Sequence, residues 1–249
     1  MDRCQNCGQP VSGAYCAHCG QKVYLERISF SFFIHEIIHF FTHLEHGFLH
    51  TTWQLLRSPG RMVTEYIAGK RKPHQSPVSY FLIWTTIFIL TLYAFVKIFG
   101  EDNVIAYKDY FGPGASTAFA ISNLSFMLAF IIPFQALYLY LILTHSKYNY
   151  SETLVMAIYA VGTIIFLQFA FALFSLAEFA FTAHPSDLRY SDILKAGYFV
   201  WFTSHLVRIL PVSNKWIRAL IFILLAAGTF TAWRLFVVPW VSGFFLHQA

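Results

Sequence analysis

Residues 152–181 read ETLVMAIYAVGTIIFLQFAFALFSLAEFAF, and this stretch decides the class of fold. A helix rises about 1.5 Å per residue, so the run exceeds the hydrocarbon core of a bilayer, which is about 30 Å thick. Backbone amides in lipid must be hydrogen-bonded internally, which favours a helix. We therefore predict a transmembrane helix that is tilted or protrudes at one end.

Further apolar runs occupy residues 78–99, 118–143, 193–210 and 216–239. The chain is 57% hydrophobic and 12% charged, whereas soluble domains average about 25% charged residues. The sequence predicts an all-α integral membrane protein with about five transmembrane helices. Residues 193–210 form the shortest run and carry His205 and Arg208, so this run decides on which side the C-terminus lies.

The basic residues predict the orientation of these helices. Eight Lys and Arg residues precede residue 78, and Lys147 and Lys215 lie in the second and fourth loops. Cytoplasmic loops carry such an excess of positive charge. We expect a multi-pass protein of the bacterial inner membrane with its N-terminus in the cytoplasm and its C-terminus outside. The basic residues near the first run fit the lipid bilayer with its anionic headgroups, and no nucleic-acid partner is expected.

Two cysteine pairs at the N-terminus predict a metal site. Each reads Cys-x-x-Cys-Gly, the spacing that lets one tight turn direct two sulfurs at one ion. A thioredoxin-like redox pair would need a surrounding βαβ unit, which residues 1–22 cannot hold. We predict a zinc ribbon with a structural Zn²⁺, which supplies the folding energy of this small domain. The expected ligands are Cys4, Cys7, Cys16 and Cys19.

A histidine-rich amphipathic helix is predicted between the ribbon and the first run. The helical pattern extends from about residue 31 to residue 58, bends at Gly47 and stops at Ser58-Pro59-Gly60, and residues 61–69 form a second amphipathic segment. We expect the first helix to be interfacial. Its polar face carries five histidines within an arc of roughly 80° and continues through Gln54 and Arg57. The histidines are His35, His39, His43, His46 and His50.

Three interpretations of this histidine stripe stay open. His35-Glu36-Ile37-Ile38-His39 fits His-Glu-x-x-His, in which the histidines bind Zn²⁺ and Glu36 would be the catalytic base. The stripe could instead hold a second, non-proteolytic metal ion, which one helix cannot ligate completely by itself. The third interpretation is a polar face packed against a partner or the headgroup layer.

A longer motif carries a family resemblance. Residues 48–61 read FLHTTWQLLRSPGR, and residues 65–71 read EYIAGKR. Together with the Cys-x-x-Cys-Gly pairs and His-Glu-x-x-His, this motif resembles the bacterial membrane family called domain of unknown function 3667. The resemblance implies a bacterial membrane protein with an N-terminal zinc ribbon, and it implies no activity.

The function expected from these features is that of a membrane-embedded interaction or scaffold protein. Residues 1–22 form the ribbon, residues 23–77 the amphipathic helices and basic loop, and residues 78–249 the transmembrane domain. The ribbon and the histidine helix would dock a protein partner or a second copy of the chain, as a subunit of a larger membrane complex. The alternatives are a membrane metalloenzyme, of hydrolase or oxygenase type, and a small transporter or lipid-binding protein.

Overall fold

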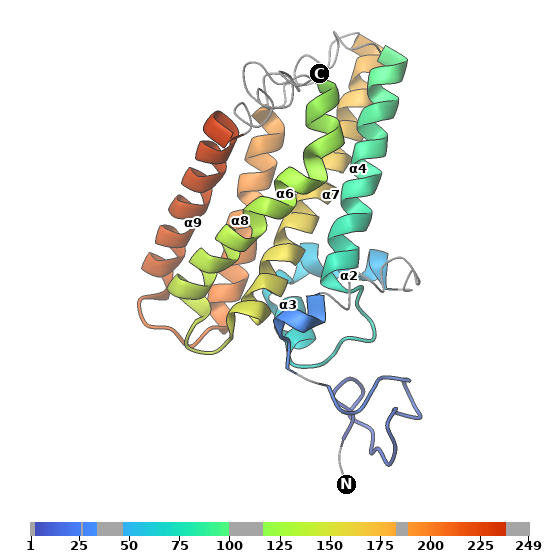
Figure 1. Ribbon diagram of the computed structural model, residues 1–249, viewed down its shortest axis with the longest axis vertical. Coiled ribbons are helices and arrows are strands. Elements are labelled where there is room, and N and C mark those ends of the chain that lie inside the picture. The colour runs from blue at the N-terminus through green and yellow to red at the C-terminus, as the bar shows by residue number, and fades with distance from the viewer. Residues whose placement is uncertain (1–2, 26, 34–46, 100–116, 183–188, 238–249) are drawn as a thin grey trace.

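The computed structural model of the protein describes residues 3–25, 27–33, 47–99, 117–182 and 189–237 (Figure 1). Within these ranges the regular secondary structure is helical, and residues 3–25 form turns with two isolated β-bridges. Three helices are long and apolar enough to cross a membrane: α4 (Pro77–Phe99), α7 (Tyr150–Thr182) and α9 (Lys215–Ala232). The predicted all-α fold is confirmed, with three helices that could cross a membrane by their length and composition.

Two further helices run beside these three in the same bundle (Figure 1). They are α6 (Thr117–Leu139), which continues into the π-helical turn η2 (Tyr140–Thr144), and α8 (Arg189–Ile209). Their bounds agree with the predicted runs to within a few residues. Among the residues described with their side chains, 128–144 form a shorter apolar helix and α8 is not one of the candidate spans. The count of five crossings therefore stays a prediction.

The direction of the chain alternates from one helix of the bundle to the next (Figure 1). The loops at residues 145–149 and 210–214 lie at the same end as the N-terminal ribbon, which we call the base of the bundle. α6 bends along its length, and Pro133, which has no N–H to donate, lies within it. The short π-helical segment η3 (Trp233–Val237) follows α9.

Helix α7 packs most closely against α4, and glycine allows the approach. A Cβ atom on Gly162 would lie 2.8 Å from the ring of Tyr80. Buried hydroxyl groups join the same helices, since the Tyr80 hydroxyl lies 3.2 Å from the Thr163 Oγ1. The Trp84 indole N–H donates to the Thr52 Oγ1 at 3.1 Å, which connects α4 to α2 (Phe48–Arg57). These bonds satisfy polar groups that burial would otherwise leave unpaired.

A helical hairpin made of α2 (Phe48–Arg57) and α3 (Pro59–Ile67) lies at the base of the bundle (Figure 1). The predicted stop at Ser58-Pro59-Gly60 lies where α2 ends and α3 begins, with Pro59 and Gly60 in the first turn of α3. A Cβ atom on Gly60 would lie 2.7 Å from the backbone of His205, so the turn sits directly on α8. Leu55 and Val63 are fully buried in the core that the hairpin shares with the bundle.

The predicted helix over residues 31–58 is interrupted. Residues 30–33 are helical, residues 34–46 lie outside the described residues, and α2 begins only after a turn at Gly47. A Cβ atom at Gly47 would lie 2.6 Å from the Pro73 carbonyl oxygen. This contact with the loop before α4 gives the physical reason for a glycine at the bend that the sequence predicted.

Candidate metal centre

The four cysteines of the ribbon come together as predicted. Their sulfur atoms all lie within 4.8 Å of one another. The Cys4 and Cys19 sulfurs are 3.6 Å apart, and so are those of Cys7 and Cys16. A tetrahedron with metal–sulfur bonds of about 2.3 Å has edges of about 3.8 Å, so this donor set fits Zn²⁺. His18 is exposed and is not part of the cluster.

The two cysteine pairs form two equivalent turns. In the first, the Gly8 N–H donates to the Cys4 carbonyl at 2.8 Å, and in the second the Gly20 N–H donates to the Cys16 carbonyl at 2.8 Å. Both glycines have positive φ, 75° and 72°, a conformation that other residues adopt only with strain. The glycine after each Cys-x-x-Cys therefore lets the backbone reverse while both sulfurs stay on one side.

Hydrogen bonds prepare part of the cluster for ionisation. The backbone N–H groups of Cys19 and His18 lower the pKa of Cys16, and the Asn6 side chain lowers the pKa of Cys19 to about 6. A hydrogen bond from the Gln9 backbone lowers the pKa of Cys7, but desolvation and the neighbouring cysteines together raise it to about 12. Four adjacent thiolates repel one another, so complete ionisation needs a cation among them.

Gln21 seats the ribbon on the loop between α3 and α4. Its side chain is only 5% exposed, and its amide Nε2 donates to the Gly69 carbonyl at 2.7 Å. Its Oε1 accepts the backbone N–H groups of Arg71 and Lys72, each at 3.2 Å. The Gln21 carbonyl in turn accepts the Cys16 N–H at 2.8 Å, so the second cysteine turn also positions Gln21.

Gly69 fits closely under the ribbon. Its φ of 107° favours glycine, and a Cβ atom there would lie 2.1 Å from the Gln5 side-chain oxygen. The guanidinium of Arg71 stacks over the rings of Phe32 and Tyr66, 5.3 and 5.7 Å from their centroids. The loop is therefore held between the ribbon on one side and Phe32 and the hairpin on the other.

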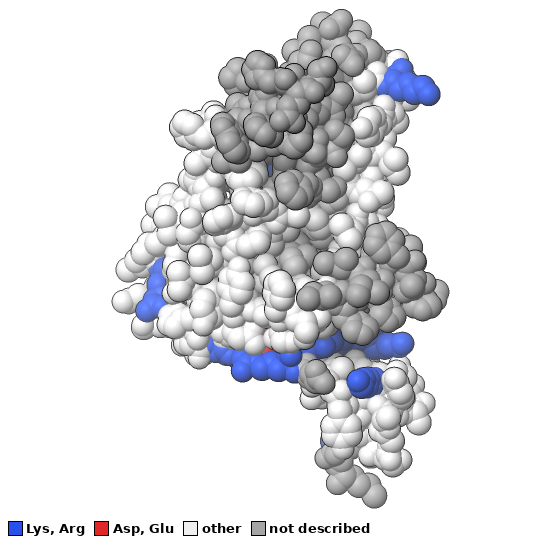
Figure 2. Space-filling view, viewed as in Figure 1, with Lys and Arg blue, Asp and Glu red and all other residues white. Residues whose placement is uncertain are grey.

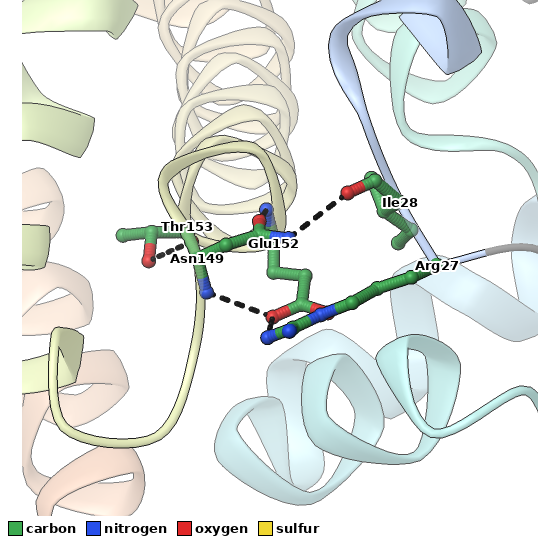
Figure 3. Close-up of polar contacts among 5 residues, drawn as sticks. All are labelled: Arg27, Ile28, Asn149, Glu152 and Thr153. Carbon is green, nitrogen blue, oxygen red and sulfur yellow. Dashed lines mark hydrogen bonds and ion pairs between the residues drawn. The ribbon is translucent and has the colours of Figure 1, made fainter.

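A second anchor joins the segment after the ribbon to the start of α7 (Figure 3). Arg27 donates from Nε and Nη2 to the two carboxylate oxygens of Glu152, at 2.7 and 3.0 Å. This pairing raises the pKa of Arg27 above its ordinary value. Asn149 caps α7 by accepting the Glu152 N–H, and its side-chain amide donates to the Ile28 carbonyl at 3.1 Å. The ribbon is thus attached to the bundle at two separate places.

Most of the histidine stripe lies outside the described residues. This applies to His35, His39, His43 and His46, and also to Glu36. Its last member, His50, is exposed on α2, and its ring centroid lies 5.6 Å from that of His74. His74 is buried, and desolvation followed by the charge of His50 lowers its pKa to about 4.

Sequence reasoning did not identify the anchoring residues of the ribbon. Gln21 and Gly69 are 48 residues apart, and Arg27 and Glu152 are 125 residues apart. Polar residues such as Gln21 often follow a cysteine pair, and acids such as Glu152 often lie in the first turn of a helix. Neither residue type therefore indicates an anchor by itself. The asparagine three residues before Glu152 was the one local signal, because it predicts a cap for the helix.

A family model described as "Protein of unknown function (DUF3667)" matches residues 45–89. The match confirms the resemblance inferred from the sequence. The matched segment contains the hairpin of α2 and α3, the loop that seats the ribbon and the first half of α4. No curated protein and no solved structure matches this chain.

Proposed function

We propose that this protein is a membrane-embedded docking platform, in which the helical bundle presents a zinc ribbon to a protein partner at the cytoplasmic surface. The observation that carries this proposal is the seat of the ribbon. The buried Gln21 bonds to three backbone groups of the loop at residues 69–72. The ribbon is therefore oriented on the bundle instead of being loosely tethered, as a docking module requires.

The surface of the ribbon that is not used by the seat is open to a partner. Tyr15, at the second cysteine turn, is 66% exposed, and Tyr24 is also exposed. Tyrosine is enriched in protein interfaces because it combines a large apolar ring with a hydroxyl group. A Cys4 ribbon is closed around its ion and has no open position for a substrate. These features favour binding of a macromolecule over catalysis at this metal.

The platform would sit in the inner membrane of a bacterium with five crossings, its N-terminus in the cytoplasm and its C-terminus outside. α6 and α8 support the additional crossings, because each carries exposed apolar side chains beside the neighbouring helices, among them Phe130, Phe134, Val200 and Ile209. Lys and Arg side chains form a band at the base of the bundle (Figure 2). Such a band is expected on the cytoplasmic side.

Site-specific photo-crosslinking in intact cells tests the platform. A photoreactive residue at Tyr15 should give a discrete adduct with a partner or with a second copy of the chain. The same residue at Lys97, in the last turn of α4 and far from the ribbon, is the matched control and should give no such adduct. Cys4→Ser should abolish the adduct. Two results together would contradict the proposal. The first is that neither Tyr15 nor His18 gives an adduct, and the second is that the variant without the ribbon is fully functional in cells.

Metal analysis of the purified protein separates the platform from the metalloenzyme. The platform requires one zinc per chain, which Cys4→Ser removes. A second ion that survives Cys4→Ser and disappears in His39→Ala would instead favour the metalloenzyme.

A further inference from the structure

The outward surface of α2 exposes large apolar side chains, although this helix lies at the base of the bundle. Leu49 and Trp53, one turn apart, are 72% and 60% exposed. The opposite side of the helix is buried through Thr51, Thr52 and Leu55. α2 therefore exposes two large apolar side chains beside His50 and Arg57, which belong to the polar face that the sequence predicted.

A neighbouring tryptophan has the orientation common at a membrane surface. Trp201 on α8 is partly exposed, and its indole N–H donates to the Leu56 carbonyl of α2 at 3.1 Å. The apolar part of the ring can then contact lipid while the polar N–H is satisfied within the protein. Trp residues are enriched at the membrane–water interface for this reason.

Basic side chains follow directly after the apolar stripe. Arg57 ends α2 one turn after Trp53, and Arg61 is exposed in α3. Lys70 and Lys72 extend the charge along the loop, and the band is visible at the base of the bundle in Figure 2. The acid nearest to these residues, Glu65, is already paired with Arg61 and Lys70.

We propose that the hairpin of α2 and α3 binds anionic phospholipid of the leaflet at the base of the bundle. Leu49 and Trp53 contact the upper part of the acyl chains, while Arg57 and Arg61 bind the headgroup phosphate. Guanidinium groups suit phosphate because they donate two parallel hydrogen bonds. The apolar stripe beside the cations favours a lipid over a free anion or an acidic protein segment, which would leave Leu49 and Trp53 in water.

Lipid titration of the full-length protein in neutral detergent tests this site. Phosphatidylglycerol should bind more tightly than phosphatidylcholine, with an affinity that falls as salt is added. The double variant Arg57→Gln/Arg61→Gln should weaken binding of phosphatidylglycerol by about 30-fold, since each basic residue near an anionic surface contributes about fivefold. Lys97→Gln at the far end of α4 is the matched control and should leave the affinity unchanged. Equal loss in both variants, or no loss in the double variant, overturns the proposal.

Two further sets of measurements distinguish loss of lipid binding from misfolding and from binding of a free anion. Arg57→Lys/Arg61→Lys keeps the charge but loses the paired hydrogen bonds, so it should weaken binding less than the glutamine double variant does. All variants should keep the zinc content of the parent protein. Inorganic phosphate should compete poorly with phosphatidylglycerol for this site. Leu49→Ser/Trp53→Gln should lower the affinity for phosphatidylglycerol but not the affinity for inorganic phosphate. Competition by inorganic phosphate at the same concentration as the lipid would overturn the lipid assignment.

Discussion

Replacing Gln21 with alanine should release the ribbon from its seat while leaving the four cysteines intact. The variant loses the amide that bonds to Gly69, Arg71 and Lys72. Each such bond contributes about 0.5–1.5 kcal/mol net. The two bonds at 3.2 Å are long, and water can enter the space of the missing amide, so we expect a cost of about 2 kcal/mol to docking.

Hydrogen exchange at single amides measures this cost. A loss of about 2 kcal/mol corresponds to about a 30-fold larger undocked population. The Lys72 amide should report it directly, because it donates to Gln21, whereas the Arg71 amide also donates to the Gly69 carbonyl at 3.0 Å. Protection of the Lys72 amide should fall by at least that factor, because the variant also removes the acceptor of this amide.

Gln9→Ala is the matched control for this experiment. It makes the same substitution at an exposed ribbon position and should leave the exchange of Lys72 unchanged. Zinc content should stay at the parent value in both variants, because neither removes a sulfur ligand. If Lys72 exchanged equally fast in the parent protein and in Gln21→Ala, the seat would contribute nothing to docking and the reasoning would be refuted.

Three further predictions concern stability in detergent. Arg27→Gln should lower the Tm, because it leaves the buried carboxylate of Glu152 without its cation, whereas Arg57→Gln at an exposed position should not. His74 takes up a proton less readily than its unfolded form, with a pKa of about 4 against 6.5. Stability should therefore fall as pH decreases through that range, and His74→Gln should reduce the slope by at most about 1.4 kcal/mol per pH unit. Gly60→Ala should destabilise by about 1–3 kcal/mol, as overpacking does, because the α8 backbone cannot move away. Gly197→Ala, which meets open space, is its control, and an equal Tm in both glycine variants would contradict the packing.

The sequence by itself determined the elements whose causes are local. The bounds of α4 and α7 agree closely with the predicted apolar runs, because hydrocarbon leaves a long apolar segment no stable alternative to a helix. The cysteine cluster was equally predictable, because each Cys-x-x-Cys-Gly turn is formed by five consecutive residues. The hairpin turn at Ser58-Pro59-Gly60 followed from the conformations that proline and glycine favour.

Only the tertiary structure decided how these elements meet. It brought Gln21 to the loop at residues 69–72 and Arg27 to Glu152, and it turned Leu49 and Trp53 away from the protein. Helical periodicity shows which residues share a face, but it does not show whether that face meets protein, lipid or water. Contacts between residues far apart in the chain depend on how all the helices pack together, and no local pattern of residues encodes that packing.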